Sequence, residues 1–154
     1  MKRELILLRH AHAERAQPGQ DDLARALSPR GVAEARAAGA WLDAHHALPA
    51  RVLCSPALRT QQTLAHALGR VGEILEPRIF EATAGQLAAL IDEHPDAPRL
   101  LLVGHNPGFE TLVALLATGQ SGDFRGMPPA GIAWFELDGA AEPGGGRLIA
   151  FWSP

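Results

Sequence analysis

The chain of 154 residues contains one cysteine, Cys54, and one lysine, Lys2. A single cysteine cannot form an intramolecular disulfide, and the sequence has no Cys–His spacing typical of a metal site. Because Cys54 lies in a short apolar run, we interpret it as a small buried hydrophobic residue. Since arginine supplies almost all of the positive charge, an arginine in this sequence is informative only through its position.

Long apolar runs and basic tracts are also absent. No segment approaches the length of a membrane span, and the apolar run at residues 5–8 is too short for a signal peptide. The net charge of −3 argues against a general nucleic-acid binder. No Gly-rich phosphate loop of the Walker type occurs. We therefore expect a cytoplasmic protein that binds neither nucleic acid nor membrane.

The composition is that of a folded protein, with 47% hydrophobic and 20% charged residues. A chain of this length can bury a proper core. It contains no internal repeat, no linker and no second composition regime. We therefore expect one domain that spans residues 1–154.

Short apolar runs alternate with amphipathic segments along the chain. The runs predict strands at residues 5–8, 51–54, 73–80, 99–103, 132–137 and 147–152, the third of them weakened by Pro77. The amphipathic segments predict helices at residues 29–45, 57–69, 85–93 and 109–117, with loops at 13–27 and 118–130. This order predicts a three-layer α/β/α sandwich whose sheet is mainly parallel, with an antiparallel strand at one edge.

Two helix starts carry the same signal. Ser28-Pro29 and Ser55-Pro56 each resemble an N-cap followed by proline at the first helical position. Arg59 falls in the first turn of the second of these helices, where a cation opposes the positive end of the helix dipole. A bound anion would satisfy both the arginine and the helix N-terminus.

Polar side chains follow three of the predicted strands. Arg9 and His10 end the first strand, Ser55 and Arg59 follow the second, and His105 follows the strand at 99–103. The carboxyl ends of parallel strands meet at one edge of a sheet, where ligands bind. Two arginines and two histidines there would form an electropositive pocket suited to phosphate. Taken alone, the Arg-His pair is equally compatible with a strand that simply ends in two polar residues.

Three segments together resemble a known family: residues 7–11 (LLRHA), 54–63 (CSPALRTQQT) and 103–108 (VGHNPG). In order, spacing and predicted context they resemble the histidine phosphatase superfamily. The short chain and the Ala11-His12 pair resemble its SixA-type branch of phosphohistidine phosphatases. The resemblance covers essentially the whole chain, and it implies a phosphoglycerate mutase-like fold and phosphatase activity without a metal or another cofactor.

The resemblance also implies a role for each matching residue. His10 would be the nucleophile that attacks phosphorus and forms a phosphohistidine intermediate, which water then hydrolyses. Arg9 and Arg59 would bind the phosphoryl oxygens, and His105, if protonated, would add a third cationic donor. For attack, His10 must present a neutral nitrogen, so its other nitrogen should donate to a fixed acceptor such as a backbone carbonyl.

The sequence departs from the family pattern at two places. The common Arg-His-Gly is here Arg9-His10-Ala11, which changes the backbone freedom after the nucleophile. The proton donor is also undefined, since Glu81 is the single well-placed candidate and is otherwise interpreted as a loop carboxylate. An alcohol leaving group needs such an acid, whereas the imidazole of phosphohistidine can leave already protonated.

Four functions remain open at this point. We favour a metal-independent phosphatase acting on phosphohistidine in a partner protein, because no connector is long enough to form a substantial lid over His10. A phosphomonoesterase of the same fold acting on small metabolites is the first alternative. A metal hydrolase using His10, His12 and His105 is another, although the sequence offers no obvious carboxylate ligands. The last is a phosphate-binding module without catalysis.

The remaining notable residues have simpler interpretations. We expect His12 at the rim of the pocket or facing solvent, His66 and His94 at the surface, and Asp21-Asp22 facing water rather than a substrate. The three tryptophans most simply serve packing: Trp41, Trp134 and Trp152.

Overall fold

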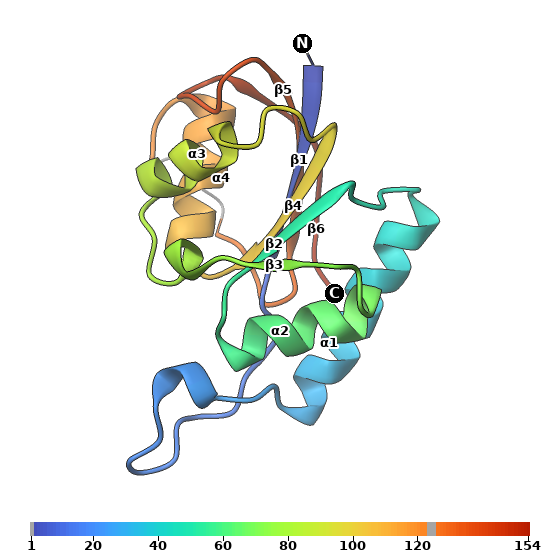
Figure 1. Cartoon of the computed structure of the whole chain (residues 1–154), viewed down its shortest axis with the longest axis vertical. Coiled ribbons are helices and arrows are strands. Elements are labelled where there is room, and N and C mark those ends of the chain that lie inside the picture. The colour runs from blue at the N-terminus through green and yellow to red at the C-terminus, as the bar shows by residue number, and fades with distance from the viewer. Residues whose placement is uncertain (1, 123–125) are drawn as a thin grey trace.

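The computed structural model describes residues 2–122 and 126–154. Within them the chain forms a six-stranded sheet with the order β3-β2-β4-β1-β5-β6 (Figure 1). The four strands β1 to β4 are parallel, β5 runs antiparallel to β1, and β6 runs antiparallel to β5. The predicted mixed α/β sheet, mainly parallel, is therefore confirmed, with β5 and β6 forming an antiparallel pair on one side. The strands are β1 (Lys2–Arg9), β2 (Arg51–Cys54), β3 (Ile74–Leu75), β4 (Arg99–Gly104), β5 (Ile132–Asp138) and β6 (Gly146–Trp152).

Helices cover both faces of the sheet. On one face lie α1 (Pro29–Ala44) and α2 (Leu58–Leu68), and on the other lie α3 (Ala84–Asp92) and α4 (Gly108–Thr118) (Figure 1). Two short 3₁₀ helices, η1 (Asp22–Ala24) and η2 (Pro77–Ile79), stand in the connections. The three-layer sandwich is thus confirmed. Within the described ranges, no helix combines the length and apolar character needed to cross a membrane.

The apolar run of β1 is continuous because both of its faces are covered. Leu5 and Leu7 belong to the core beneath α3 and α4, whereas Ile6 and Leu8 belong to the core beneath α1 and α2. All four side chains have no exposed surface. Alternating side chains of a strand point to opposite faces, so a strand between two helical layers contains no polar position until it ends. The first polar side chains, Arg9 and His10, therefore mark the edge of the core.

The two predicted helix starts differ in the structure. The Ser28 hydroxyl accepts a hydrogen bond from the Gly31 N–H at 3.1 Å and caps α1, as predicted. The prediction for Ser55 is wrong, because α2 begins at Leu58 and its N-cap residue, Ala57, makes no side-chain cap. The physical reason is that Ser55 is fully buried and its hydroxyl contacts the side chain of His105, the residue after β4, instead.

The predicted strand at residues 73–80 is wrong beyond Leu75. Ile74 and Leu75 pair with β2, and Pro77 then begins the 3₁₀ helix η2, which the Glu76 carboxylate caps through the Arg78 N–H at 3.0 Å. Proline has no N–H for the strand ladder, so the sheet cannot continue. The chain instead turns across the carboxyl edge of the sheet.

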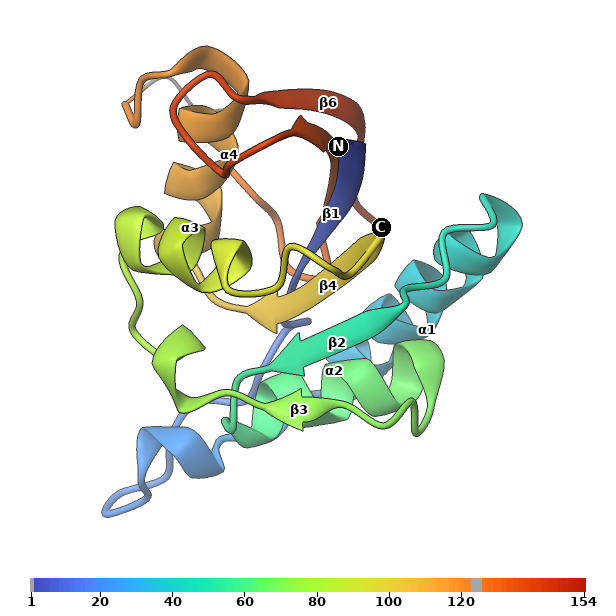
Figure 2. The same ribbon diagram turned by 45° about the horizontal axis from the view of Figure 1, so that its top comes forward.

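The predicted loop at residues 13–27 contains η1 and a single antiparallel bridge between Ala13 and Leu27. Figure 2 shows this loop projecting beyond the carboxyl ends of the parallel strands. The predicted loop at 118–130 is described only at 118–122 and 126–130, because residues 123–125 lie outside the described residues.

Candidate active site

The ends of β1 and β4 bring two histidines together. The parallel register pairs Arg9 with Gly104, and the His10 N–H donates to the Gly104 carbonyl at 3.0 Å. His105 is the residue after β4, and its ring centroid lies 5.4 Å from that of His10, with the planes inclined by 55°. The structure therefore brings together two residues that the sequence places 95 positions apart.

The His10 ring is held in one orientation. Its Nδ1 lies 2.8 Å from the Ala11 carbonyl oxygen, which can only accept, so Nδ1 carries the proton and Nε2 keeps its lone pair. Burial lowers the pKa of His10 to about 4; the Ala11 carbonyl opposes this shift, while Arg9 and Arg59 add to it. His10 is therefore neutral at pH 7, as nucleophilic attack through Nε2 would require. The predicted backbone acceptor is present.

A buried threonine ties this part of β1 to α2. The Thr63 hydroxyl accepts from the Ala11 N–H at 3.0 Å and donates to the Arg59 carbonyl at 2.7 Å. Thr63 and Ala11 have no exposed surface, and Ala11 is not among the residues with a positive φ. The alanine that replaces the family's usual glycine therefore needs no left-handed backbone. The peptide that holds His10 is linked directly to the first turn of α2.

Arg59 reaches the site from α2 with a side chain that is 7% exposed. Its two terminal nitrogens donate to Asp22, one to the backbone oxygen at 2.8 Å and one to the carboxylate at 3.0 Å. Arg25 donates to the other carboxylate oxygen at 3.1 Å. Burial raises the pKa of Asp22, but hydrogen bonds from Arg25 and Arg59 outweigh it and the net shift is downward. Asp22 is half-exposed and so faces water in part, as expected, but its carboxylate also binds Arg59.

Arg9 connects the site to the segment at residues 126–131. Its terminal nitrogen donates to the Met127 carbonyl at 2.8 Å, and the Asn106 amide donates to the same oxygen at 2.9 Å. Burial lowers the pKa of Arg9, and the nearby Glu110 carboxylate opposes that shift. The backbone adds two bonds, from the Arg9 N–H to the Gly131 carbonyl and from the Ala130 N–H to the His10 carbonyl, both at 3.1 Å. This segment is therefore fixed beside the two strand ends.

His105 is bonded to the buried serine that follows β2. Its Nε2 lies 2.8 Å from the Ser55 hydroxyl oxygen. Burial lowers the pKa of His105 to about 3, and the neighbouring His10 and Arg59 contribute to the same shift. Without a ligand, His105 is therefore neutral at pH 7, in contrast to the protonated histidine considered from the sequence.

Three buried polar atoms of this site have no hydrogen-bond partner: Arg9 Nε, Arg59 Nε and His105 Nδ1. Among residues 2–122 and 126–154 they are the full set of such side-chain atoms. A buried donor without a partner costs about 1–3 kcal/mol, so native proteins seldom contain several together. Their concentration around His10 indicates a site that lacks its anion, because the oxygens of one tetrahedral oxyanion could accept from all three.

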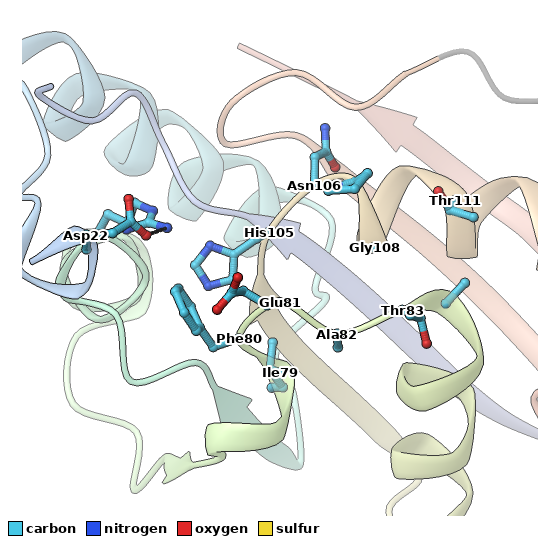
Figure 3. A pocket seen from close by; sticks show the side chains of 13 residues that line it. Asp22, Ile79, Phe80, Glu81, Ala82, Thr83, His105, Asn106, Gly108 and Thr111 are labelled. Carbon is cyan, nitrogen blue, oxygen red and sulfur yellow. Dashed lines mark hydrogen bonds and ion pairs between the residues drawn. The ribbon is translucent and has the colours of Figure 1, made fainter. Parts of the chain in front are cut away.

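A hollow of about 610 Å³ adjoins these groups. It is open to solvent, and Figure 3 shows the side chains of Asp22, Phe80, Glu81 and His105 around it. Arg59 also lines it, whereas Arg9 and His10 are not among its lining residues. The other lining residues are Ile79, Ala82, Thr83, Ala84, Asn106, Pro107, Gly108 and Thr111.

Two residues after η2 form one side of this hollow. Glu81 is exposed and has a positive φ of 59°, so the chain turns sharply there. The Phe80 ring packs edge-on against His105 with the centroids 5.4 Å apart, and it lies 6.0 Å from the Arg59 guanidinium carbon. The sequence prediction named Glu81 but not Phe80, since nothing in the pattern indicated that the strand would stop before it.

The other histidines and the tryptophans named in the sequence analysis do not line the hollow. The His12 ring contacts the Ser28 hydroxyl at 2.6 Å and does not line the hollow. His66 is exposed, and His94 is half-buried against Arg51 at 3.2 Å. No group of three or more metal-ligating side chains occurs among the described residues. The tryptophans pack together as predicted, with Trp41 stacked on Trp152 and edge-on to Trp134.

Comparison with known proteins gives a consistent result. The family model of the histidine phosphatase superfamily (branch 1) matches residues 5–97. An uncharacterised protein of Mycobacterium tuberculosis is 36% identical over 155 residues, which cover 93% of this chain and 98% of the relative. A crystal structure from Agrobacterium tumefaciens, described as a candidate phosphohistidine phosphatase SixA, has 30% identity and a TM-score of 0.83, covering 99% of this chain and 98% of that one.

A further solved structure is described as the protein histidine phosphatase SixA complexed with tungstate. It has 26% identity and a TM-score of 0.83, covering 98% of this chain and 97% of that one. Together with the fold, these similarities define an α/β phosphatase. The chain belongs to the histidine phosphatase superfamily, and its fold is similar to solved structures described as SixA phosphohistidine phosphatases.

Proposed function

We propose that this protein is a metal-independent phosphatase that removes the phosphoryl group from phosphohistidine in a partner protein. The observation that carries the proposal is the set of three unpartnered buried atoms, from Arg9, Arg59 and His105, around a neutral His10. Phosphoryl transfer needs a nucleophile and, beside it, hydrogen-bond donors arranged to bind the phosphoryl oxygens.

In the proposed reaction, the lone pair of His10 Nε2 attacks phosphorus as the bond to the leaving group breaks. The phosphoryl group is then carried on Nε2, while Nδ1 continues to donate to the Ala11 carbonyl. Water attacks the phosphorus in the second step, and inorganic phosphate leaves as the His10 lone pair is restored. Arg9 and Arg59 stabilise the charge on the phosphoryl oxygens in both steps.

The leaving group bears on the substrate. A phosphohistidine imidazole can depart as a protonated ring, so the reaction needs no acid at a fixed position. Solvent can reach the hollow beside His105, and a protein side chain could enter from the same direction. The similarity to solved proteins described as phosphohistidine phosphatases supports this substrate class.

A small-molecule phosphomonoesterase is the second candidate, and the position of Glu81 favours it. The Glu81 carboxylate lines the hollow together with His105 and Arg59, where a general acid would protonate an alcohol leaving group. Turnover of phosphohistidine and of sugar phosphates should be compared in the wild type and in Glu81→Ala. Turnover restricted to sugar phosphates and dependent on Glu81 would replace the first proposal by the second.

The direct test is to trap the intermediate. After brief exposure to a phosphohistidine-containing protein and rapid denaturation, the chain should carry acid-labile phosphate that peptide mapping locates on His10. His10→Ala should lose this label and at least about a thousandfold in turnover while retaining phosphate binding. Unchanged activity in His10→Ala would identify a binding module. Activity that a chelator abolishes would identify a metal hydrolase.

A further inference from the structure

Ser55 is a buried polar residue of the site that the proposed reaction does not use. It follows β2, has no exposed surface, and places its hydroxyl oxygen 2.8 Å from His105 Nε2. The Ala57 N–H donates to the same oxygen at 3.3 Å. This serine is not the helix cap that the sequence pattern suggested, so its hydroxyl needs another explanation.

The direction of the Ser55–His105 bond follows from counting protons. A serine hydroxyl has one proton to donate and two lone pairs that accept. The Ala57 N–H occupies one lone pair, and within the described part of the chain His105 Nε2 is the one acceptor found for the hydroxyl proton. The reverse direction would leave the proton of a fully buried hydroxyl unpaired. Ser55 therefore donates, and Nε2 of His105 accepts.

This direction fixes the tautomer of His105. A neutral imidazole that accepts at Nε2 carries its proton at Nδ1. Nδ1 is the buried atom of His105 that has no partner in the ligand-free protein. We propose that Ser55 is a positioning residue that holds His105 as the Nδ1–H tautomer, so that a neutral His105 donates a hydrogen bond to a phosphoryl oxygen.

A neutral donor suits the surroundings of His105. The charged and titratable groups facing the ring are His10, Arg9, Arg59, Asp22 and Glu81. The two arginines already supply positive charge, and their proximity disfavours a third cation on His105 itself. The hydrogen bond from Ser55 thus keeps the ring proton of His105 on Nδ1 without adding a charge.

The role of Ser55 in turnover rests on the proposed phosphatase function, but the tautomer does not. The wild-type protein labelled with ¹⁵N at histidine should be studied by long-range ¹H–¹⁵N correlation NMR at pH 7, with the His105 signals assigned by their loss in His105→Gln. We expect a protonated Nδ1 and a bare Nε2. A proton on Nε2 would overturn the proposal without any variant of Ser55.

Ser55→Ala tests the consequence for turnover. The spectrum of this variant should lose the single Nδ1–H form of His105, and kcat for phosphohistidine should fall about tenfold or more. Ser28→Ala is the matched control, because Ser28 is also a buried serine that contacts a histidine, His12, outside the hollow. It should leave the His105 signals and kcat unchanged.

The outcomes separate the two proposals. An unchanged tautomer and unchanged kcat in Ser55→Ala would refute the positioning role. If the wild type has the expected tautomer but turns over no phosphorylated substrate, the phosphatase proposal fails, and weaker binding of inorganic phosphate to Ser55→Ala would still support the role of Ser55. If Ser55→Ala does not fold, the wild-type spectrum decides.

Discussion

The two ends of β1 each hold an arginine, and the two arginines are treated differently. Arg3, at the start of the strand, is 9% exposed and donates to the carbonyls of Ile91 and Gly139 and to the Asp92 carboxylate. Arg9, at the end, donates once to Met127, and its Nε has no partner. Arg3 connects three parts of the fold, whereas Arg9 retains an N–H donor that no other group of the protein accepts from. A partner count therefore separates a structural arginine from one suited to bind a ligand.

The comparison predicts its largest effect at Arg9. In Arg9→Gln we expect kcat/KM for the phosphorylated substrate to fall about a hundredfold, because one donor to the phosphoryl oxygens is lost. The free energy of unfolding should change by less than about 1 kcal/mol, because the arginine satisfies few groups of the fold. Steady-state kinetics and urea denaturation of the same preparation measure both quantities. A large loss of stability with little loss of activity would show that Arg9 is a structural arginine and not a ligand-binding one.

Arg3→Gln should give the opposite result. We expect the free energy of unfolding to fall by about 2 kcal/mol, since the variant removes hydrogen bonds to two carbonyls and leaves the Asp92 carboxylate without its cation. In a chain of this length that loss lowers Tm by about 4–8 °C. At a temperature where the variant is folded, kcat/KM should equal that of the wild type. A loss of activity at that temperature would show that the contacts at the start of β1 affect the site at its end.

The site should also weaken the fold in acid. Burial holds the pKa values of His10 and His105 near 4 and 3, whereas in the unfolded chain both histidines titrate near their ordinary value of about 6.5. Between these values the unfolded state binds more protons, so the free energy of unfolding decreases as pH falls from about 6.5 toward 4. We expect at least about 1 kcal/mol from each histidine over this range.

Urea denaturation at a series of pH values measures this dependence. His105→Gln should make the slope shallower below pH 6.5, because one of the two buried histidines is removed. His66→Gln is the control, since His66 is exposed and should leave the slope unchanged. Equal slopes in the wild type and in His105→Gln would show that His105 does not contribute to the acid sensitivity.

The smallest effect is expected at Asp22, whose carboxylate accepts a hydrogen bond from Arg59 in the ligand-free protein. In Asp22→Asn the loss of the negative charge should strengthen phosphate binding about threefold, a small effect because the Asp22 carboxylate is half-exposed and solvent screens its charge. Titration calorimetry with inorganic phosphate gives the affinity. Asp21→Asn is the matched control, because Asp21 only caps η1. Weaker binding in Asp22→Asn would mean that the carboxylate positions Arg59 and does not compete with phosphate.

The part of the site that could be predicted from the sequence depends on strand ends. Arg9, His10 and His105 follow apolar runs whose parallel pairing is a general property of α/β sheets, so their meeting required no knowledge of side-chain contacts. The unusual position of Arg59 in its helix likewise indicated an anion. The backbone acceptor of His10 could be expected because a nucleophilic imidazole needs one.

The remaining features depend on long-range contacts that no local pattern encodes. Ser55 precedes a proline and so matches a helix cap, but the hydroxyl contacts a histidine 50 residues away. Asp22 lies in a polar loop, and its partner Arg59 is 37 residues further along the chain. Phe80 reaches the hollow because Pro77 ends the strand early. The sequence indicates that this proline weakens the strand, but not where the chain goes after it.

The buried hydroxyl of Thr63 has a consequence for how the protein would meet its substrate. Through it, the peptide after His10 and the backbone of Arg59 form one rigid unit before any ligand arrives. In the proposed reaction, the attacking nitrogen and the arginine that binds the phosphoryl group are thus preorganised, and little ordering entropy is lost when the substrate binds. Recognition can then rely on a chemical group that is small and common to many proteins, while the surface around it stays free to differ.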